Sequence, residues 1–332
     1  MTTGHRQNPP PRPAPPAPAR PVPPFPPPAP PGPPPWQRIA VDIPGMEFEA
    51  RPPGQYAFDF PDSECDGWST EALTVRFASV RGAKHRYYRQ PRQDCARAAV
   101  HEATGSVVFA VADGVSSATE AQQGAVEACR ASVERLLHLL AEAPGPLDLA
   151  DVASFAATRL VELARWRLGS ADAGPAEAAR LYATTLVAGA VRPAAGGPQA
   201  ELFRIGDSCA WLLDRASGRY RPLFGSKTGT DTVLVTNEVA PLPHVPDHLE
   251  QAAFPLTDPW LLVAGTDGFG DPLGDGDGAV GALFARHLAV PPSPLWLGHV
   301  LDFSRETFDD DRTLLAVWPR TAPGPLPQAR PR

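Results

Sequence analysis

Residues 106–117 read SVVFAVADGVSS, an unbroken run of small and β-branched apolar residues that stops at Asp113-Gly114. An apolar run without a polar break, followed by a turn that contains glycine, predicts a strand covered on both faces. Asp113 follows at the point where that buried strand reaches solvent. The sequence therefore predicts a strand that carries one carboxylate to a turn at its end.

The same pattern of an apolar run beside aspartates occurs at two further places. Residues 260–271, WLLVAGTDGFGD, lead from an apolar run into Asp267 and then Asp271. The order is inverted at the third place, where three aspartates at 309–311 come before the apolar run TLLAVW at 313–318. Three strands of this kind would gather acidic side chains at one end of a sheet.

Carboxylates gathered in this way predict a metal site. Like charges a few ångströms apart raise one another's pKa and are costly to bury unless cations neutralise them. Oxygen ligands suit Mg²⁺ or Mn²⁺, whereas Zn²⁺ favours His and Cys. Asp-Gly is also a common turn dipeptide, so a turn alone explains any single pair. The conjunction of acidic strand ends is what favours the metal.

Composition divides the chain of 332 residues into four parts. Residues 9–35 consist largely of Pro and Ala, a composition that favours polyproline II and cannot bury an apolar face. We therefore expect a disordered arm over residues 1–55, a lead-in segment at 56–70 and a disordered tail at 320–332. The remaining residues, 71–319, are long enough to bury a sizeable core as one domain.

Charge, hydropathy and cysteine spacing exclude several classes of protein. The net charge of -7 argues against a nucleic acid as the main partner. No apolar run is long enough to span a membrane and no apolar signal segment follows Met1, so we expect a cytoplasmic protein. The cysteines form no CxxC pair, which fits reduced packing residues rather than a disulfide frame or a zinc cluster. They are Cys65, Cys95, Cys129 and Cys209.

Hydrophobic periodicity predicts strands and helices along the rest of the chain. Alternating or continuous short apolar runs indicate strands, and apolar residues at helical spacing indicate amphipathic helices that would cover the two outer sheet faces. The expected strands lie at residues 73–80, 95–100, 107–112, 182–191, 201–205, 209–213, 261–264 and 313–318. The expected helices lie at residues 118–141, 148–168, 279–289 and 295–307. The second of these helices has a capping aspartate, Asp148, and a terminal glycine, Gly169.

The stretch between the first two strands is basic. Residues 81–95, RGAKHRYYRQPRQDC, are dense in cations and place Gln93-Asp94 directly before a β-prone stretch. Cations so close to an acid indicate an anion site. The alternative is a solvated basic loop, because charged side chains in such runs usually face solvent.

Six short motifs occur in order along the chain. They are Arg89-x-x-x-Gln93-Asp94, VADGV at 111–115, ATTL at 183–186, RIGDS at 204–208, GTDGFGD at 265–271 and DDRT at 310–313. Together they resemble the signatures of the metal-dependent serine/threonine protein phosphatases of type 2C, in particular a bacterial branch, over about residues 70–318. The resemblance implies an α+β fold, a four-layer α-β-β-α sandwich of two antiparallel sheets flanked by helices, with a metal centre at one end.

The resemblance also implies a centre of two Mn²⁺ or Mg²⁺ ions. Asp113 would bridge the two ions, the carbonyl of Gly114 would bind one of them, and Asp267 and Asp310 would complete the other. Such a pair of ions lowers the pKa of a bridging water, which then attacks phosphorus in line with the leaving group. No phosphoenzyme is then needed.

Four more residues match positions near this centre. Asp94 would hold coordinated water or an additional ion, and Asp207 and Asp271 match a third, weaker metal site. Gln93 replaces a glutamate that ligates metal in many members of the family. Its amide oxygen can ligate, but more weakly than a carboxylate because it carries no charge.

The basic loop supplies the phosphate-binding residue that the resemblance implies. Arg89 lies where the family has its phosphate-binding arginine, and a guanidinium fits phosphate oxygens bidentately. Arg86 or His85 could bind phosphate instead. Val115 stands where some members have a histidine proposed as general acid, and Cys209 replaces an arginine of the usual motif. The usual flap signature is not recognisable in residues 220–250.

By resemblance, the chain is expected to be a protein-serine/threonine phosphatase that acts on phosphorylated proteins, opposite a Ser/Thr protein kinase. The alternative is a pseudophosphatase that binds a phosphoprotein without turnover, motivated by Gln93 and the altered flap. A third interpretation makes the Pro-rich arm a ligand for domains with aromatic grooves. A passive tether is the simpler explanation of that arm, because composition alone identifies no partner.

Overall fold

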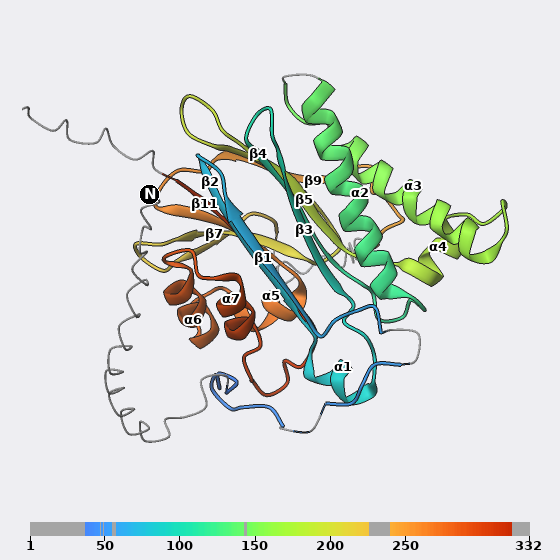
Figure 1. Ribbon diagram of the computed structural model, residues 1–332, viewed down its shortest axis with the longest axis horizontal. Helices are drawn as coiled ribbons and strands as arrows, with labels where there is room; N and C mark the ends of the chain where they lie inside the picture. Colours follow the sequence, from blue (N-terminus) through green and yellow to red (C-terminus); the bar gives the residue numbers. More distant parts are fainter. Residues whose placement is uncertain are drawn as a thin grey trace, which may run out of the picture. The chain divides into compact units, whose positions relative to one another are not determined.

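Two antiparallel sheets pack face to face at the centre of the fold, with helices on both outer sides (Figure 1). The computed structural model describes residues 37–46, 48, 50–54, 58–142, 145–225 and 240–320. Its layers confirm the expected four-layer α-β-β-α sandwich of the α+β class. No helix among these residues is both long and apolar enough to cross a membrane.

The six-stranded sheet has the order β1-β2-β11-β10-β7-β8. Its last strand in the sequence, β11, pairs with β2 on one side and with β10 on the other, so the 309–311 aspartates and Asp267 are brought to the same end. The strands are β1 (Ser63–Ser69), β2 (Leu73–Val80), β7 (Cys209–Asp214), β8 (Tyr220–Pro222), β10 (Trp260–Gly265) and β11 (Arg312–Pro319).

The five-stranded sheet has the order β3-β4-β5-β6-β9. The apolar stretch at 107–112 forms its second strand, which is buried as predicted. The register of β3 and β4 places Asp94 directly opposite Asp113. The strands are β3 (Asp94–His101), β4 (Ser106–Asp113), β5 (Leu186–Arg192), β6 (Gln199–Ile205) and β9 (Glu250–Pro255).

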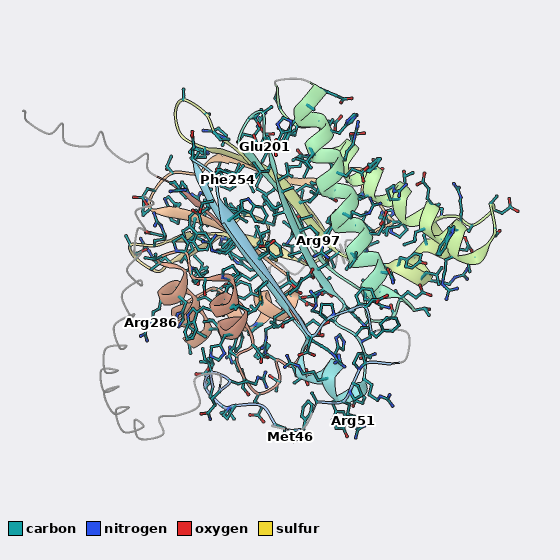
Figure 2. The ribbon with its side chains drawn as sticks, in the orientation of Figure 1. Met46, Arg51, Arg97, Glu201, Phe254 and Arg286 are labelled. Atoms are coloured by element: carbon teal, nitrogen blue, oxygen red, sulfur yellow. The ribbon has the colours of Figure 1, made fainter. Side chains whose placement is uncertain are left out.

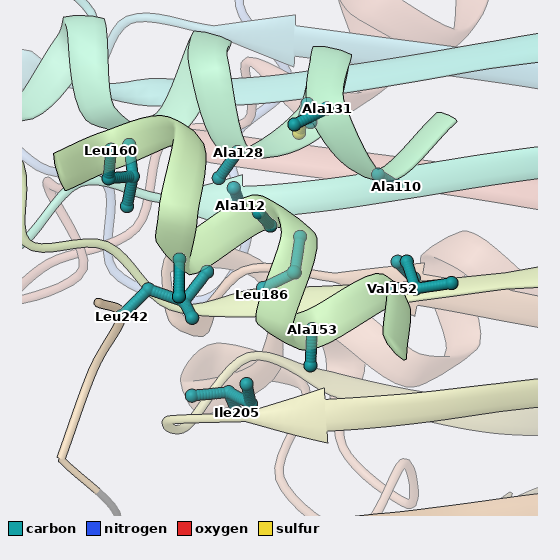
Figure 3. Close-up of a cluster of buried hydrophobic side chains, with 14 of the residues drawn as sticks. Ala110, Ala112, Ala128, Ala131, Val152, Ala153, Leu160, Leu186, Ile205 and Leu242 are labelled. Carbon is teal, nitrogen blue, oxygen red and sulfur yellow. The ribbon is translucent and has the colours of Figure 1, made fainter. Parts of the chain in front are cut away.

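Alanine-rich helices cover the outer face of the five-stranded sheet. They are α2 (Ala121–Glu142), α3 (Leu149–Leu168) and α4 (Pro175–Tyr182). Figure 3 shows Ala128 and Ala131 of α2 beside Ala110 and Ala112 of β4, all four of them buried. Alanine side chains on both surfaces let the helix approach the sheet closely at these positions.

The outer face of the six-stranded sheet is covered by larger side chains. Its helices are α5 (Asp267–Leu273), α6 (Ala279–Leu288) and α7 (Pro294–Leu301). Phe269, Phe284 and Phe303 are fully buried and meet edge to face, with ring centroids 4.9 and 6.0 Å apart. Edge-to-face contacts of this kind add to the stability gained from burial alone. A short helix, α1 (Ala83–Tyr88), follows β2.

Several sequence predictions are confirmed to the residue. The expected strand at 73–80 is β2, and the expected helix at 148–168 is α3 with its cap. The Asp148 side chain accepts a hydrogen bond from the Asp151 amide at 3.0 Å, and Gly169 ends the helix with φ 62°. Cap chemistry and periodicity agree here, which is why the boundaries were predictable.

Other predicted boundaries are wrong. The strand expected at 182–191 starts only at Leu186, because Tyr182 is the last residue of α4. The helix expected at 295–307 ends at Leu301, and Thr307 takes the left-handed φ of 69°. α1, α4, α5, β1, β8 and β9 were not predicted. They are short, and glycine or proline inside α5 and at the start of α4 hides the helical pattern.

The segment before β1 packs on the domain further upstream than the expected arm boundary at residue 55. Val41 is buried and its amide donates to the Ser304 carbonyl at 2.9 Å. Arg51 stacks on the ring of Tyr87 in α1, and Figure 2 shows Arg51 beside that helix. Within the arm and tail predicted as disordered, residues 1–36 and 321–332 lie outside the described residues.

Candidate metal centre

Four aspartates from four separate elements come together at one end of the sandwich. Asp94 begins β3 and Asp113 ends β4, directly opposite it. Asp267 begins α5, and Asp310 lies just before β11. The charges of Asp94, Asp267 and Asp310 all act on Asp113, which shows that the sandwich gathers the acids that the sequence placed at strand ends.

Without a bound cation, the carboxylates of this cluster repel one another and destabilise the folded protein. Burial first, and then the neighbouring carboxylates, raise the pKa of Asp94 and of Asp113 well above the usual range. Burial likewise raises the pKa of Asp267, with Asp207, Asp271 and Asp310 adding to the effect. Within the described part of the chain, no Lys or Arg forms an ion pair with Asp94, Asp113 or Asp267. Oxygen donors that repel one another and lack a protein cation fit a divalent metal ion.

Threonine hydroxyl groups hold two of the acids in place. Thr266, the residue before α5, donates its hydroxyl to Asp94 Oδ2 at 2.7 Å. The amide of Asp113 donates to the Thr185 hydroxyl at 3.1 Å, and the Asp113 carbonyl accepts from the Thr185 amide at 2.8 Å. The Thr185 hydroxyl also contacts that of Ser208 at 2.6 Å. The ATTL and RIGDS motifs therefore act as the support of Asp113.

Gly114 is required by close packing beside the cluster. A Cβ at this position would lie 2.6 Å from the Ala121 carbonyl oxygen at the start of α2. The Gly114 amide donates to the Gln93 carbonyl at 3.2 Å, so this turn is tied to the start of β3. Gln93 itself is buried. Two residues expected to bind metal thus lie beside the four aspartates.

Asp311 is a buried residue of this site, which the sequence placed among the acids at 309–311 without assigning it a role of its own. Its Oδ1 accepts a hydrogen bond from the Gly82 amide and its Oδ2 one from the Gln93 amide, each at 2.6 Å. It therefore ties the end of β2 and the start of β3 to the segment that carries Asp310. Adjacent aspartates look alike in the sequence, and only the pairing of β2 with β11 distinguishes the inward one.

The two arginines expected to bind phosphate differ in their exposure to solvent and in their ion pairs. Arg86 is engaged by Asp62 and Asp302, with nitrogen–oxygen distances of 2.9 and 3.0 Å. Arg89 is exposed, takes φ 62° at the end of α1, and donates from Nε to the Pro52 carbonyl at 3.3 Å. Of these two arginines, Arg86 forms ion pairs with described residues, whereas Arg89 forms none with them.

His85, the third phosphate candidate, is enclosed beside Asp310 and Asp311. Burial lowers the pKa of its ring, but the contact with Asp311 and the charges of Asp310 and Asp94 outweigh burial and raise it. The third-site acids, Asp207 and Asp271, act electrostatically on Asp267. In the predicted flap region, residues 226–239 lie outside the described residues.

Comparisons with known proteins bear on the whole domain. A family model described as protein phosphatase 2C matches residues 81–294. The catalytic domain of the serine threonine protein phosphatase PstP, solved with two manganese ions, shares 17% identity at a TM-score of 0.50, over 75% of this chain and 99% of that one.

Two further solved structures are similar at slightly lower scores. The Ser-Thr phosphatase MsPP from Mycobacterium smegmatis, in complex with cacodylate, shares 17% identity at a TM-score of 0.47, over 75% of this chain and 99% of that one. RsbX in complex with magnesium shares 12% identity at a TM-score of 0.49, over 77% of this chain and 100% of that one. No curated protein matches the chain. At these identities the structural likeness concerns the fold alone.

Proposed function

The chain belongs to the protein phosphatase 2C family, and from this premise we propose that it is a metal-dependent phosphatase that hydrolyses phosphoserine and phosphothreonine in proteins. The observation that carries the proposal is the convergence of Asp94, Asp113, Asp267 and Asp310, the first three of which form no ion pair with a Lys or Arg among the described residues. Burying such a cluster is costly to the fold, so its presence points to a function that uses cations there.

We propose Asp113, the Gly114 carbonyl, Asp267 and Asp310 as the residues that hold two Mn²⁺ or Mg²⁺ ions. Asp94 and Gln93 support them, and a third ion would lie near Asp207 and Asp271. When bound, such ions supply an activated water and offset the charge of the transferring phosphoryl group.

The chain's own residues position the substrate and the acids. Thr266 fixes the carboxylate of Asp94, and Thr185 fixes the main chain on both sides of Asp113. Arg89 is the proposed phosphate contact, because its exposed guanidinium can turn two donors toward phosphate oxygens. Arg86 is less suited to that role, because its guanidinium already pairs with both Asp62 and Asp302.

We propose that the substrates are products of a Ser/Thr protein kinase, because that class of enzyme makes phosphoserine and phosphothreonine. Recruitment through the Pro-rich arm at residues 9–35 and a location in the cytoplasm stay predictions of the sequence. The arm lies outside the described residues.

The test uses the full chain, stripped of metal with EDTA and assayed with phosphoserine and phosphothreonine peptides. Activity should return on titration with Mn²⁺ or Mg²⁺. Asp113→Asn and Asp267→Asn should each lower kcat/KM by more than about 100-fold, since loss of a ligand should exceed the loss seen for its supporting residues. Asp172→Asn, an exposed acid outside the cluster, is the matched control and should retain activity.

Two results would count against the proposal. Hydrolysis that survives both substitutions would remove the cluster from the reaction. Mn²⁺ binding without hydrolysis of any phosphopeptide would favour a pseudophosphatase that binds its phosphoprotein without turnover.

A further inference from the structure

His85 is a buried side chain whose Nε2 has no hydrogen-bond partner among the described residues. Its exposed fraction is 2%, so water does not solvate the ring freely. A buried polar group without a partner is costly, and native proteins keep few of them. We therefore expect this ring nitrogen to bind a ligand or to serve a function.

Nδ1 of His85 faces a carboxylate that is itself held rigidly. It lies 2.8 Å from Asp311 Oδ2, which is within hydrogen-bonding distance. Asp311 cannot turn away, because the amides of Gly82 and Gln93 hold both of its oxygens. A carboxylate beside one ring nitrogen orients the imidazole and leaves the other nitrogen's lone pair for a metal, as is usual for metal-ligating histidines.

Nε2 of His85 faces Asp310. It lies 3.7 Å from Asp310 Oδ1, which is beyond hydrogen-bonding distance. One ion with bonds of about 2.1 Å can bridge ligand atoms up to about 4.2 Å apart, so this spacing accommodates a cation between them. The three side chains present ligand atoms within 4.8 Å of one another.

The same place is accessible to an entering ion. The side chain of Asp310 is 48% exposed, so water can complete the coordination of an ion held there. The Lys84 ammonium lies 3.9 Å from the other oxygen, Asp310 Oδ2. Because Lys84 is 43% exposed on a flexible stem, it can turn to solvent when a cation binds.

We propose that His85 is a metal ligand, and that its Nε2 and the Asp310 carboxylate hold one transition-metal cation, with Asp311 as the residue that orients the ring. This inference rests on the proposed function, since Asp310 also belongs to the proposed two-ion centre. Imidazole suits transition metals, whereas Mg²⁺ prefers oxygen ligands throughout. The site therefore biases this end of the sandwich toward Mn²⁺ over Mg²⁺.

The direct test is pulsed electron paramagnetic resonance of the untagged, Mn²⁺-loaded full chain in a nitrogen-free buffer. A Mn–imidazole bond produces modulation from the coordinated ¹⁴N, and ¹⁵N-histidine labelling of the wild-type protein should change it. His85→Gln should abolish the modulation and lower Mn²⁺ affinity at this site by about tenfold or more, with a smaller loss for Mg²⁺. His138→Gln, an exposed histidine on α2, should leave both unchanged.

The labelling arm needs no variant, so the test stands even if His85→Gln fails to fold. Absence of histidine nitrogen modulation in the loaded wild-type protein would overturn the inference and leave His85 as an imidazolium that pairs with the acids. Modulation that persists in folded His85→Gln would overturn it as well. Phosphopeptide hydrolysis is measured on the same samples. A wild type that is active with Mn²⁺ but shows no nitrogen coupling refutes the histidine ligand and leaves the proposed function standing.

Discussion

Replacing Asp311 by asparagine should destabilise the domain even when no metal is present. The amide oxygen can replace one carboxylate oxygen, but the amide nitrogen then faces a backbone N–H of Gly82 or Gln93, both of which are buried. Leaving one buried donor without an acceptor costs about 1–3 kcal/mol, and loss of the charge from the other hydrogen bond costs about 1 kcal/mol more.

An opposing effect reduces this cost. The charge of Asp311 is, after burial, the next cause of the raised pKa of Asp94, so its removal relieves some repulsion in the cluster. Two short charge-assisted hydrogen bonds and the contact with His85 outweigh that relief. We expect a net loss of about 1–3 kcal/mol in the free energy of unfolding, which lowers Tm by about 2–12 °C in a domain of this size.

Urea unfolding in EDTA, followed by tryptophan fluorescence, measures this loss without any contribution from bound metal. Asp311→Ala, which removes both acceptors, should lose more stability than Asp311→Asn. The exposed neighbour Asp309→Asn should stay within about 0.5 kcal/mol of the wild type. An Asp311→Asn protein as stable as the wild type would refute the assignment of Asp311 as the link between the segments of the site.

Three further predictions concern the cluster and its support. Burial raises the pKa of Asp267, so the folded metal-free protein binds more protons than the unfolded chain and loses stability as pH rises from about 4 through the raised value. Asp267→Asn should therefore raise the Tm of the metal-free protein at pH 7 while reducing its stabilisation by Mn²⁺, and a lower metal-free Tm would contradict this. Thr185→Val removes the hydroxyl that accepts from the Asp113 amide and should cost about 1–3 kcal/mol in urea unfolding. Unchanged stability there would argue against the supporting role. Gly82→Ala would place a Cβ 2.2 Å from the Asp310 carbonyl carbon, so calorimetry should show weakened Mn²⁺ binding. Wild-type affinity would show that Asp310 had not been displaced.

The predictability of the fold followed the strength of local signals. The strand at 107–112 and the helix at 148–168 were predictable because burial, periodicity and capping agree there. The short helix α5 was not, because its residues DGFGDPL contain two glycines and a proline and resemble a turn. The edge strand β1 has no periodic apolar face, and its pairing with β2 is what defines it. The family expected from the motifs is confirmed.

The candidate site was predictable where its acidic side chains lie at the ends of strands. Asp113, Asp267 and Asp310 each adjoin an apolar run, and the sandwich brings them together as expected. Asp311 could not be predicted, because its role depends on hydrogen bonds to amides more than 200 positions away. The burial of His85 was also hidden, since the basic residues around it are typical of a solvated loop. The assigned roles of these residues stay predictions until metal binding is measured.

The position of β11 in the middle of its sheet has a consequence for protein synthesis. β2 is translated well before β11, which is one of its two neighbours in the sheet. Until then, β2 and β10 each present a row of unpaired backbone groups, which is the surface through which nascent chains aggregate. The sheet can therefore close only after β11 has been translated, and a chain cut before Arg312 cannot pair β2 with β11.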